Sequence, residues 1–108
     1  MSPITTHVLD TAKGCPASNI EVKLEYSNQG KWQTVAVGVT DSDGRIMDWM
    51  ETKAHVGEYR ITFATAAYHD NKGFFPSVSI NFIIENPEQH YHVPLLLSPF
   101  SFSTYRGS

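Results

Sequence analysis

The feature that most constrains this chain is a two-residue alternation of apolar and polar side chains. Between residues 20 and 26 the apolar side chains are Ile20, Val22, Leu24 and Tyr26, and a charged residue lies between each pair of them. Successive side chains of a β-strand point to opposite faces, so this pattern predicts a strand with one buried and one solvent-facing side. The same period recurs in residues 35–39, 59–63 and 78–84, and further extended runs cover residues 5–10, 90–97 and 101–106.

Turn-forming residues separate these runs. Residues 27–30 (SNQG) and 41–44 (DSDG) each end in a glycine, which can adopt a positive φ in a tight turn. Only residues 64–71 have a composition suited to a helix, and it would be a short one. These features predict an all-β fold, a two-sheet antiparallel β-sandwich of about eight strands with one short helix. The length of 108 residues corresponds to one domain, residues 1–108.

Composition and charge exclude several functional classes. The net charge is −3 and the eight Lys and Arg residues form no run, so we expect no nucleic-acid partner. No apolar run is long enough to cross a bilayer, and the first residues do not resemble a secretory signal, so we expect no membrane partner and a cytoplasmic location. The single cysteine, Cys15, excludes an internal disulfide framework. Phosphate-binding and dinucleotide-binding motifs are absent, and no cofactor is expected.

The segment His90-Tyr91-His92-Val93-Pro94 carries the most chemical information. In a strand, His90, His92 and Pro94 share one face, and Tyr91 and Val93 share the opposite, core-facing side. Proline has no N–H to donate, so it marks an edge or an irregularity in the sheet at this point.

Three interpretations of the two histidines remain open. They can be ordinary surface residues. They can bind a metal ion together, for which another histidine or a carboxylate would have to supply a third ligand. They can act as acid–base groups, because the ordinary histidine pKa near ~6.5 suits proton transfer at neutral pH.

Three other features are candidates for a site. Arg45 directly follows the Asp-Gly turn, which holds it on a defined backbone, although a lone arginine at this place is often only a surface residue. His7 lies in the first predicted strand, beside Val8. The terminal segment Tyr105-Arg106-Gly107-Ser108 follows a run that looks paired, which favours an ordered tail.

Several of these segments together resemble one family. They are residues 6–11 (THVLDT), 40–45 (TDSDGR), 74–76 (FFP), 90–99 (HYHVPLLLSP) and 103–108 (STYRGS). The chain resembles the 5-hydroxyisourate hydrolases, the transthyretin-like proteins of purine catabolism, from about residue 5 to its last residue. Transthyretin, the thyroid-hormone carrier, shares the Leu-Leu-Ser-Pro segment but lacks the His-x-His, the Asp-Gly-Arg arginine and the Tyr-Arg-Gly-Ser ending.

The resemblance implies a homotetramer with a central channel and with active sites at the dimer–dimer interface. It implies hydrolysis of a small-molecule substrate, 5-hydroxyisourate, to 2-oxo-4-hydroxy-4-carboxy-5-ureidoimidazoline, by a His/Arg acid–base mechanism without metal or cofactor. The implied catalytic residues are His7, Arg45, His92 and Ser108, and the implied substrate-binding residues are His90, Pro94, Tyr105, Arg106 and Gly107. Phe100 and Phe102 stand where the family more usually has tyrosine, and Ala66 where it often has glycine.

The alternative is a transthyretin-like carrier with a small molecule in its channel. The imidazole and guanidinium groups at His7, Arg45 and His92 argue against an apolar channel of that kind. A sandwich that served only protein interaction would leave the paired histidines and the tail motif without a role.

Overall fold

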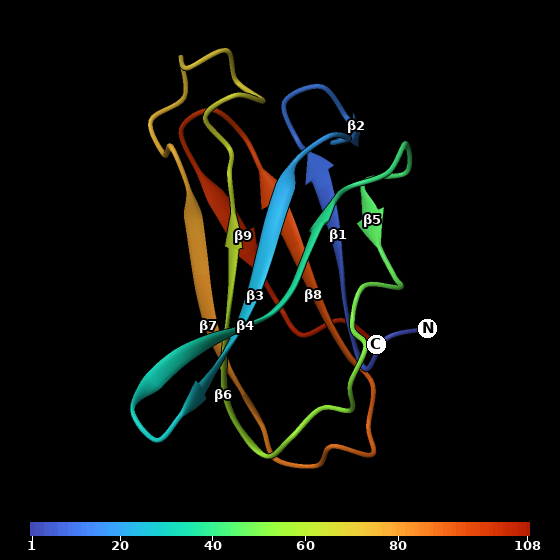
Figure 1. The fold of residues 1–108 in the computed structure, drawn as a ribbon. Coiled ribbons are helices and arrows are strands. Elements are labelled where there is room, and N and C mark those ends of the chain that lie inside the picture. Colours follow the sequence, from blue (N-terminus) through green and yellow to red (C-terminus); the bar gives the residue numbers. More distant parts are fainter.

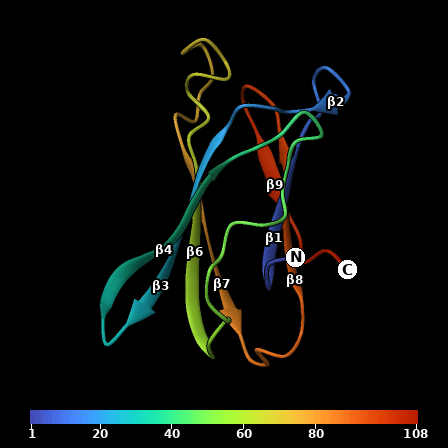
Figure 2. The ribbon, with the colours of Figure 1, turned by 45° about the vertical axis from the view of Figure 1, so that its right-hand side comes forward.

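The computed structural model describes residues 1–108, which form nine strands in two sheets (Figure 1). The strands are β1 (Ile4–Asp10), β2 (Cys15–Pro16), β3 (Glu21–Asn28), β4 (Lys31–Val39), β5 (Arg45–Ile46), β6 (Gly57–Phe63), β7 (Val78–Ile84), β8 (Tyr91–Leu97) and β9 (Phe102–Thr104). Sheet A has the order β2-β1-β8-β9, with β5 also paired to β1, and sheet B has the order β4-β3-β6-β7. Figure 2 shows the two sheets as separate layers. The predicted two-sheet sandwich is confirmed.

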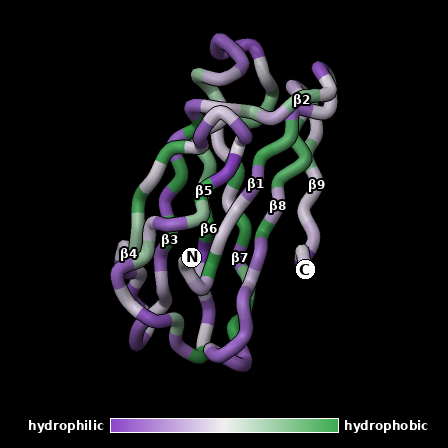
Figure 3. The backbone as a smooth tube through the Cα atoms, turned by 90° about the vertical axis from the view of Figure 1, so that its right-hand side faces the viewer, coloured by the Kyte–Doolittle hydropathy of each residue, from purple (hydrophilic) through white to green (hydrophobic).

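The core lies between the two layers. Sheet A contributes alternate residues of β1 and β8, and sheet B contributes alternate residues of β3, β6 and β7. The largest fully buried side chains include Tyr59, Phe63, Leu24, Leu95 and Leu97. Burial of one such side chain stabilises the fold by about 1.5–3 kcal/mol, more than a typical single hydrogen bond, so this interface holds the sheets together. Figure 3 shows apolar segments along β1 and β8 and a polar loop leading into β8.

One strand pair departs from the antiparallel prediction. β1 and β8 run parallel, and seven successive residue pairs join Ile4–Asp10 to Tyr91–Leu97. A parallel pair cannot be joined by a tight turn, and here all of sheet B lies between the two strands in the sequence. The pairing brings two segments from opposite ends of the chain side by side.

The alternation in residues 35–39 predicts that Val35, Val37 and Val39 share the buried side of their strand, and this is wrong for two of them. Val37 and Val39 are exposed, and the inward positions of β4 are Ala36 and Gly38. These small residues lie opposite Leu24 and Val22. A Cβ atom added at Gly38 would lie 3.3 Å from Ile46 and from Trp49, so those two side chains already occupy the space that a larger residue would need.

The predicted short helix at residues 64–71 is also wrong, because this segment forms turns. The Asn71 N–H donates to the Ala66 carbonyl, and Asp70 and Asn71 have positive φ values of 52° and 60°, which end any helical geometry after about one turn. The structure has no helix long and apolar enough to span a membrane.

A buried carboxylate ties this turn segment to sheet A. Asp10, at the end of β1, accepts a hydrogen bond of 2.6 Å from the Tyr68 hydroxyl and two from the backbone N–H groups of Ala12 and Lys13. Burial would raise the pKa of Asp10, but the Tyr68 bond and the two N–H bonds together lower it below its usual 3.8. Burial and the Asp10 carboxylate raise the pKa of Tyr68.

We predict that Tyr68→Phe lowers the free energy of unfolding by about 1.5–3 kcal/mol at pH 7, because it removes a hydrogen bond to a charged group. A lowered native pKa of Asp10 stabilises the fold above pH 3.8, and this contribution is lost as the pH falls through the native value. Urea unfolding of both proteins at several pH values measures the difference, which should shrink in acid.

Tyr26→Phe is the matched control, because its hydroxyl donates a neutral hydrogen bond of 2.8 Å to the Val56 carbonyl. The effect of that change should not vary with pH over the same range. Equal pH dependence in both variants would contradict the assignment to Asp10.

Candidate active site

The predicted site residues gather on the outer face of sheet A, the face turned away from sheet B. His7 of β1 lies opposite Arg45 of β5 on one side and beside Pro94 of β8 on the other. Residues directly opposite in neighbouring strands present their side chains to the same face. Arg45, His7 and Pro94 therefore form a row across three strands.

A second row lies one step along the strands. Thr5 of β1 pairs with His92 of β8, and His92 forms an antiparallel bridge with Gly107. Thr5 lies two residues before His7, and His92 two residues before Pro94, so both rows belong to one face. The structure thus brings His7, Arg45, His92 and Gly107 into one neighbourhood.

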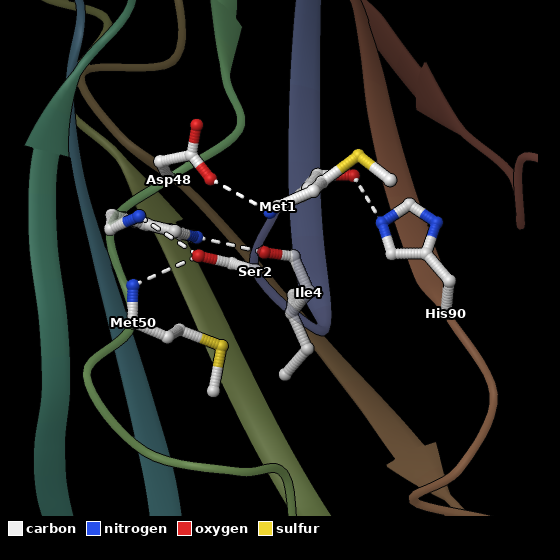
Figure 4. Close-up of polar contacts among 8 residues, drawn as sticks. Met1, Ser2, Ile4, Asp48, Met50 and His90 are labelled. Carbon is white, nitrogen blue, oxygen red and sulfur yellow. Dashed lines mark hydrogen bonds and ion pairs between the residues drawn. The ribbon is translucent and has the colours of Figure 1, made fainter.

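The two histidines of the His-x-His segment share a single hydrogen-bond partner. The Thr5 Oγ1 atom lies 2.7 Å from Nδ1 of His92 and 3.0 Å from Nε2 of His90. The two rings are roughly parallel, at an interplanar angle of 25° and a centroid separation of 6.4 Å. The prediction that both histidines lie on one face is confirmed. Figure 4 shows the His90 ring next to the start of β1, with a dashed line for its hydrogen bond to Thr5.

A tight turn fixes the backbone of Arg45. The Asp41 carboxylate accepts hydrogen bonds from the N–H groups of Asp43 and Arg45, and these bonds lower the pKa of Asp41. Gly44 has a φ of 74° and its carbonyl accepts from the Val8 N–H, which ties the turn to β1. A Cβ atom at Gly44 would collide with the Val8 carbonyl oxygen, so glycine is needed there.

The segment after β5 is also held against β1. The Ser2 N–H donates to the Met47 carbonyl, and the Ser2 hydroxyl oxygen accepts from the backbone N–H of Trp49. The same hydroxyl oxygen accepts from the backbone N–H of Met50 (Figure 4). The Trp49 indole N–H donates to the Ile4 carbonyl at 2.8 Å. Arg45 is therefore anchored from both sides, although its side chain is exposed.

The tail packs against His92. The Gly107 N–H donates to the His92 carbonyl at 2.8 Å, and a Cβ atom at Gly107 would lie only 2.6 Å from Cδ2 of the His92 ring. The backbone groups of His92 and Pro94 are directed to the same side of β8, toward β9 and the tail. Because proline has no N–H, Pro94 cannot donate a backbone hydrogen bond to β9. The Pro94 carbonyl instead accepts from the Thr104 hydroxyl at 2.7 Å. Pro94 therefore marks an irregularity between β9 and the Gly107 bridge, as predicted.

Arg106 points away from this face. Its guanidinium lies 4.4 Å from the centre of the Tyr91 ring and donates to the Gln89 side chain at 3.1 Å. Tyr91 is buried on the core side of β8. The structure thus places Arg106 where it holds the tail, while Tyr105 and Ser108 are exposed.

Electrostatics favour the neutral form of His92. Its partial burial lowers its pKa below the usual 6.5, and positive charge on His7, His90 and Arg45 lowers it further. A histidine of this kind is unprotonated at neutral pH and is available as a base. No three His, Cys, Asp or Glu side chains form a group that could hold a metal ion.

The cavities of the single chain do not enclose this face. A hollow of about 260 Å³ between β7 and the tail is lined partly by His92, Tyr105 and Arg106, and another of about 350 Å³ lies beside His90. A wider hollow of about 700 Å³ lies on sheet B, around Val37 and Val39, and contains no histidine. His92 and His90 therefore lie beside small hollows, whereas His7 and Arg45 line none of these three.

Thr5 is not among the residues that the sequence predicts for the site. The alternation places Thr5 on the same face as His7, but only the parallel pairing of β1 with β8 puts it between the two histidines.

Comparison with known proteins identifies the family of this chain. The model of the HIUase/Transthyretin family matches residues 4–107. The chain belongs to this family. A 5-hydroxyisourate hydrolase of Salmonella dublin is 44% identical over 109 residues, which cover 97% of this chain and 80% of that protein. The predicted resemblance is thereby confirmed.

Solved structures of the family share the fold. The 5-hydroxyisourate hydrolase of Klebsiella pneumoniae matches with a TM-score of 0.85 at 33% identity, covering 97% of this chain and 98% of that one. Sea bream transthyretin in complex with thyroxine matches with a TM-score of 0.89 at 35% identity, covering 97% and 94% of the two chains. The fold is thus common to hydrolases and to a hormone-binding protein, and the site must distinguish between them.

We predict that an NMR titration of the histidine rings places the pKa of His92 below 6.5, and that Arg45→Gln moves it upward. The upward shift should be partial, because burial of the ring remains. Below pH 6.5 the unfolded chain binds more protons at this position than the native one, so His92 also makes the fold less stable in acid.

Arg60→Gln is the control for the loss of one arginine charge, because Arg60 lies on sheet B and pairs with Glu25 at 3.0 Å. Titration of His92 at or above pH 6.5 in the unaltered protein would contradict the electrostatic account.

Proposed function

We propose that this chain hydrolyses 5-hydroxyisourate to 2-oxo-4-hydroxy-4-carboxy-5-ureidoimidazoline, the reaction of urate degradation. The observation that carries the proposal is the single outer face of sheet A, on which a histidine held neutral lies beside a second histidine and an arginine. Membership of the HIUase/Transthyretin family and the 44% identity to the Salmonella dublin hydrolase support it.

The reaction opens a ring at a cyclic amide. A water oxygen forms a bond to the ring carbonyl carbon, and the bond from that carbon to the ring nitrogen breaks. One proton of the water must be removed as the oxygen attacks, and the leaving nitrogen must receive a proton. His92, with His7 nearby, takes the proton and returns it to the nitrogen, so the site needs no metal or cofactor.

Arg45 binds the oxygen on which negative charge develops. The Asp41–Gly44 turn fixes the backbone of Arg45, which lies opposite His7. The Arg45 guanidinium is therefore at the edge of the outer face of sheet A, the face that holds His7 and His92. A preorganised donor to an oxyanion commonly contributes about 10²–10³ in rate. The same guanidinium can bind a flat substrate rich in carbonyl oxygens through two parallel hydrogen bonds.

The tail completes this side of the site. Gly107 packs against the His92 ring edge, and Arg106 holds the tail through Tyr91 and Gln89. Ser108, the residue after Gly107, orients the substrate or a histidine. Pro94, His90 and the exposed Tyr105 contribute to the surrounding wall.

The open face suggests that assembly supplies the remaining walls. β7 and β9 are edge strands, with the exposed apolar side chains Ile83 on β7 and Phe102 on β9, and the exposed Tyr105 directly follows β9. Such edges are suited to pairing with another copy of the chain. We expect a homotetramer with its sites between dimers, which analytical ultracentrifugation would test. The cytoplasm is the expected compartment, which cell fractionation would test.

The second candidate is a small-molecule carrier, which the similarity to thyroxine-bound transthyretin favours. An apolar ligand would have to lie against His7, Arg45 and His92. Desolvating these polar groups without partners is unfavourable, so the arrangement supports hydrolysis better.

We predict that catalytic amounts of the protein accelerate the ultraviolet decay of 5-hydroxyisourate generated from urate by urate oxidase. His92→Ala and Arg45→Ala should each reduce kcat/KM by about 10²-fold or more, because they remove the base and the oxyanion donor. His55→Ala is the matched control, since this exposed histidine lies tilted beside the Tyr26 ring of sheet B, with the ring centroids 5.9 Å apart, and belongs to no part of the site. Wild-type turnover in both site variants would overturn the assigned roles. If the unaltered protein does not accelerate the decay, the hydrolase is refuted and the small-molecule carrier is favoured.

The tail makes a separate prediction. Gly107→Ala should lower turnover without unfolding the chain, because the added methyl group meets Cδ2 of His92 and pushes the tail or the ring from its place. Ser103→Ala is the control in the exposed strand β9. The same assay measures both variants, and a fully active Gly107→Ala enzyme would show that the tail does not need this close contact.

A further inference from the structure

Thr5 occupies an unusual place for a hydroxyl group. It has no exposed surface, yet it lies on the outer face of sheet A rather than in the core between the sheets. Its Oγ1 atom lies within hydrogen-bond distance of two imidazole nitrogens, Nδ1 of His92 and Nε2 of His90. The neighbouring Thr6, by contrast, donates to a single acceptor, the Val93 carbonyl, at 2.6 Å.

A hydroxyl carries a single proton, which limits what the two rings can do. Thr5 can donate to one nitrogen, and it must then accept from the other. The nitrogen that accepts from Thr5 must be bare, and the nitrogen that donates to it must carry a hydrogen. The protonation of the two facing nitrogens is therefore opposite whenever both bonds are made.

Two arrangements satisfy this rule. In the first, Thr5 donates to a bare Nδ1 of His92, so the proton of neutral His92 is on Nε2 and that atom cannot act as a base. In the second, Nδ1–H of His92 donates to Thr5 and Thr5 donates to a bare Nε2 of His90. The second arrangement leaves Nε2 of neutral His92 with a free lone pair.

The surroundings of His92 favour the second arrangement as the reactive one. The Cδ2 atom adjacent to Nε2 packs against Gly107, and no group of the chain forms a hydrogen bond with Nε2 itself. Nδ1 is directed to Thr5 over the shorter of the two contacts, 2.7 Å. Nε2 is thus the ring nitrogen left for substrate or water.

We propose that Thr5 is a positioning residue that fixes the tautomer of His92, so that Nδ1 carries the proton and Nε2 accepts one from the attacking water. This role rests on the proposed hydrolase function. Thr5 touches no reacting atom and acts only through His92.

The same contact links His90 to the reaction. When His92 takes up a proton, its Nδ1–H continues to donate to Thr5, and Thr5 continues to donate to His90. In this arrangement the Nε2 of His90 that faces Thr5 remains the acceptor of the Thr5 hydroxyl proton. The titratable or charged groups that face His92 are His90, His7 on β1 and Arg45 on β5. His90 is thus the partner that lets Thr5 keep one orientation throughout the cycle.

The test compares three variants of β1. Thr5→Val keeps the shape of the side chain and removes the hydroxyl, and Thr5→Ser keeps the hydroxyl. We expect Thr5→Val to lower kcat by about 10–100-fold with little change in KM, as loss of a partner that orients a histidine does elsewhere, and Thr5→Ser to retain most of kcat. Thr6→Val is the matched control, because it also removes a fully buried threonine bond between β1 and β8 but touches neither histidine.

A second measurement does not depend on turnover. Nitrogen-15 NMR of the imidazole rings reports which nitrogen carries the proton. In the unaltered protein at neutral pH we expect the proton of His92 on Nδ1 and a bare Nε2 on His90. In Thr5→Val we expect His92 to become a mixture of both tautomers, and in Thr6→Val it should remain unchanged.

The outcomes separate this inference from the proposed function. A His92 proton on Nε2 in the unaltered protein would overturn the inference even if Thr5→Val failed to fold. Unchanged tautomers in Thr5→Val, or equal losses of kcat in Thr5→Val and Thr5→Ser, would reduce Thr5 to a packing residue and overturn it as well. Failure of the unaltered protein to hydrolyse 5-hydroxyisourate would refute the hydrolase and with it the catalytic part of this role, while the NMR result would still decide the hydrogen-bond pattern.

Discussion

The arrangement of the site depends on the parallel ladder between β1 and β8. Its seven residue pairs fix the register in which Thr5 meets His92 and His7 meets Pro94. A slip by one residue would turn the side chains of one strand to the other face, burying His92 or His7 and exposing core residues such as Val8 or Leu95. The same hydrophobic burial that joins the two sheets therefore also holds the polar groups in register on the outer face.

Two further constraints complete the face from either side of this ladder. The Asp41–Gly44 turn positions Arg45 beside β1. On the other side, the pairing of β8 with β9 ends before Pro94, and the tail contacts β8 again where Gly107 pairs with His92. Each uses a residue for its backbone properties, the positive φ of Gly44 and the missing N–H of Pro94. The polar face is thus carried by rigid backbone, which preorganises its groups.

The sequence predicted the strands well, because alternation reports directly which side chains are buried. It placed His90 and His92 on one face, and the structure agrees. It could not predict the parallel pairing of β1 with β8, since no local pattern records which distant strands meet. Thr5 was missed for that reason. Val37 and Val39 were placed wrongly because Ile46 and Trp49 fill the space that valines would need, and that is a long-range packing effect.

A crystal structure of the protein with urate, a stable purine of nearly the same shape as the proposed substrate, would test the central claim most directly. The account predicts urate on the outer face of sheet A, with an oxygen bonded by Arg45 and a ring edge facing His92 and His7, next to the Gly107 tail. Urate bound only in the hollow around Val37 and Val39 on sheet B would contradict it.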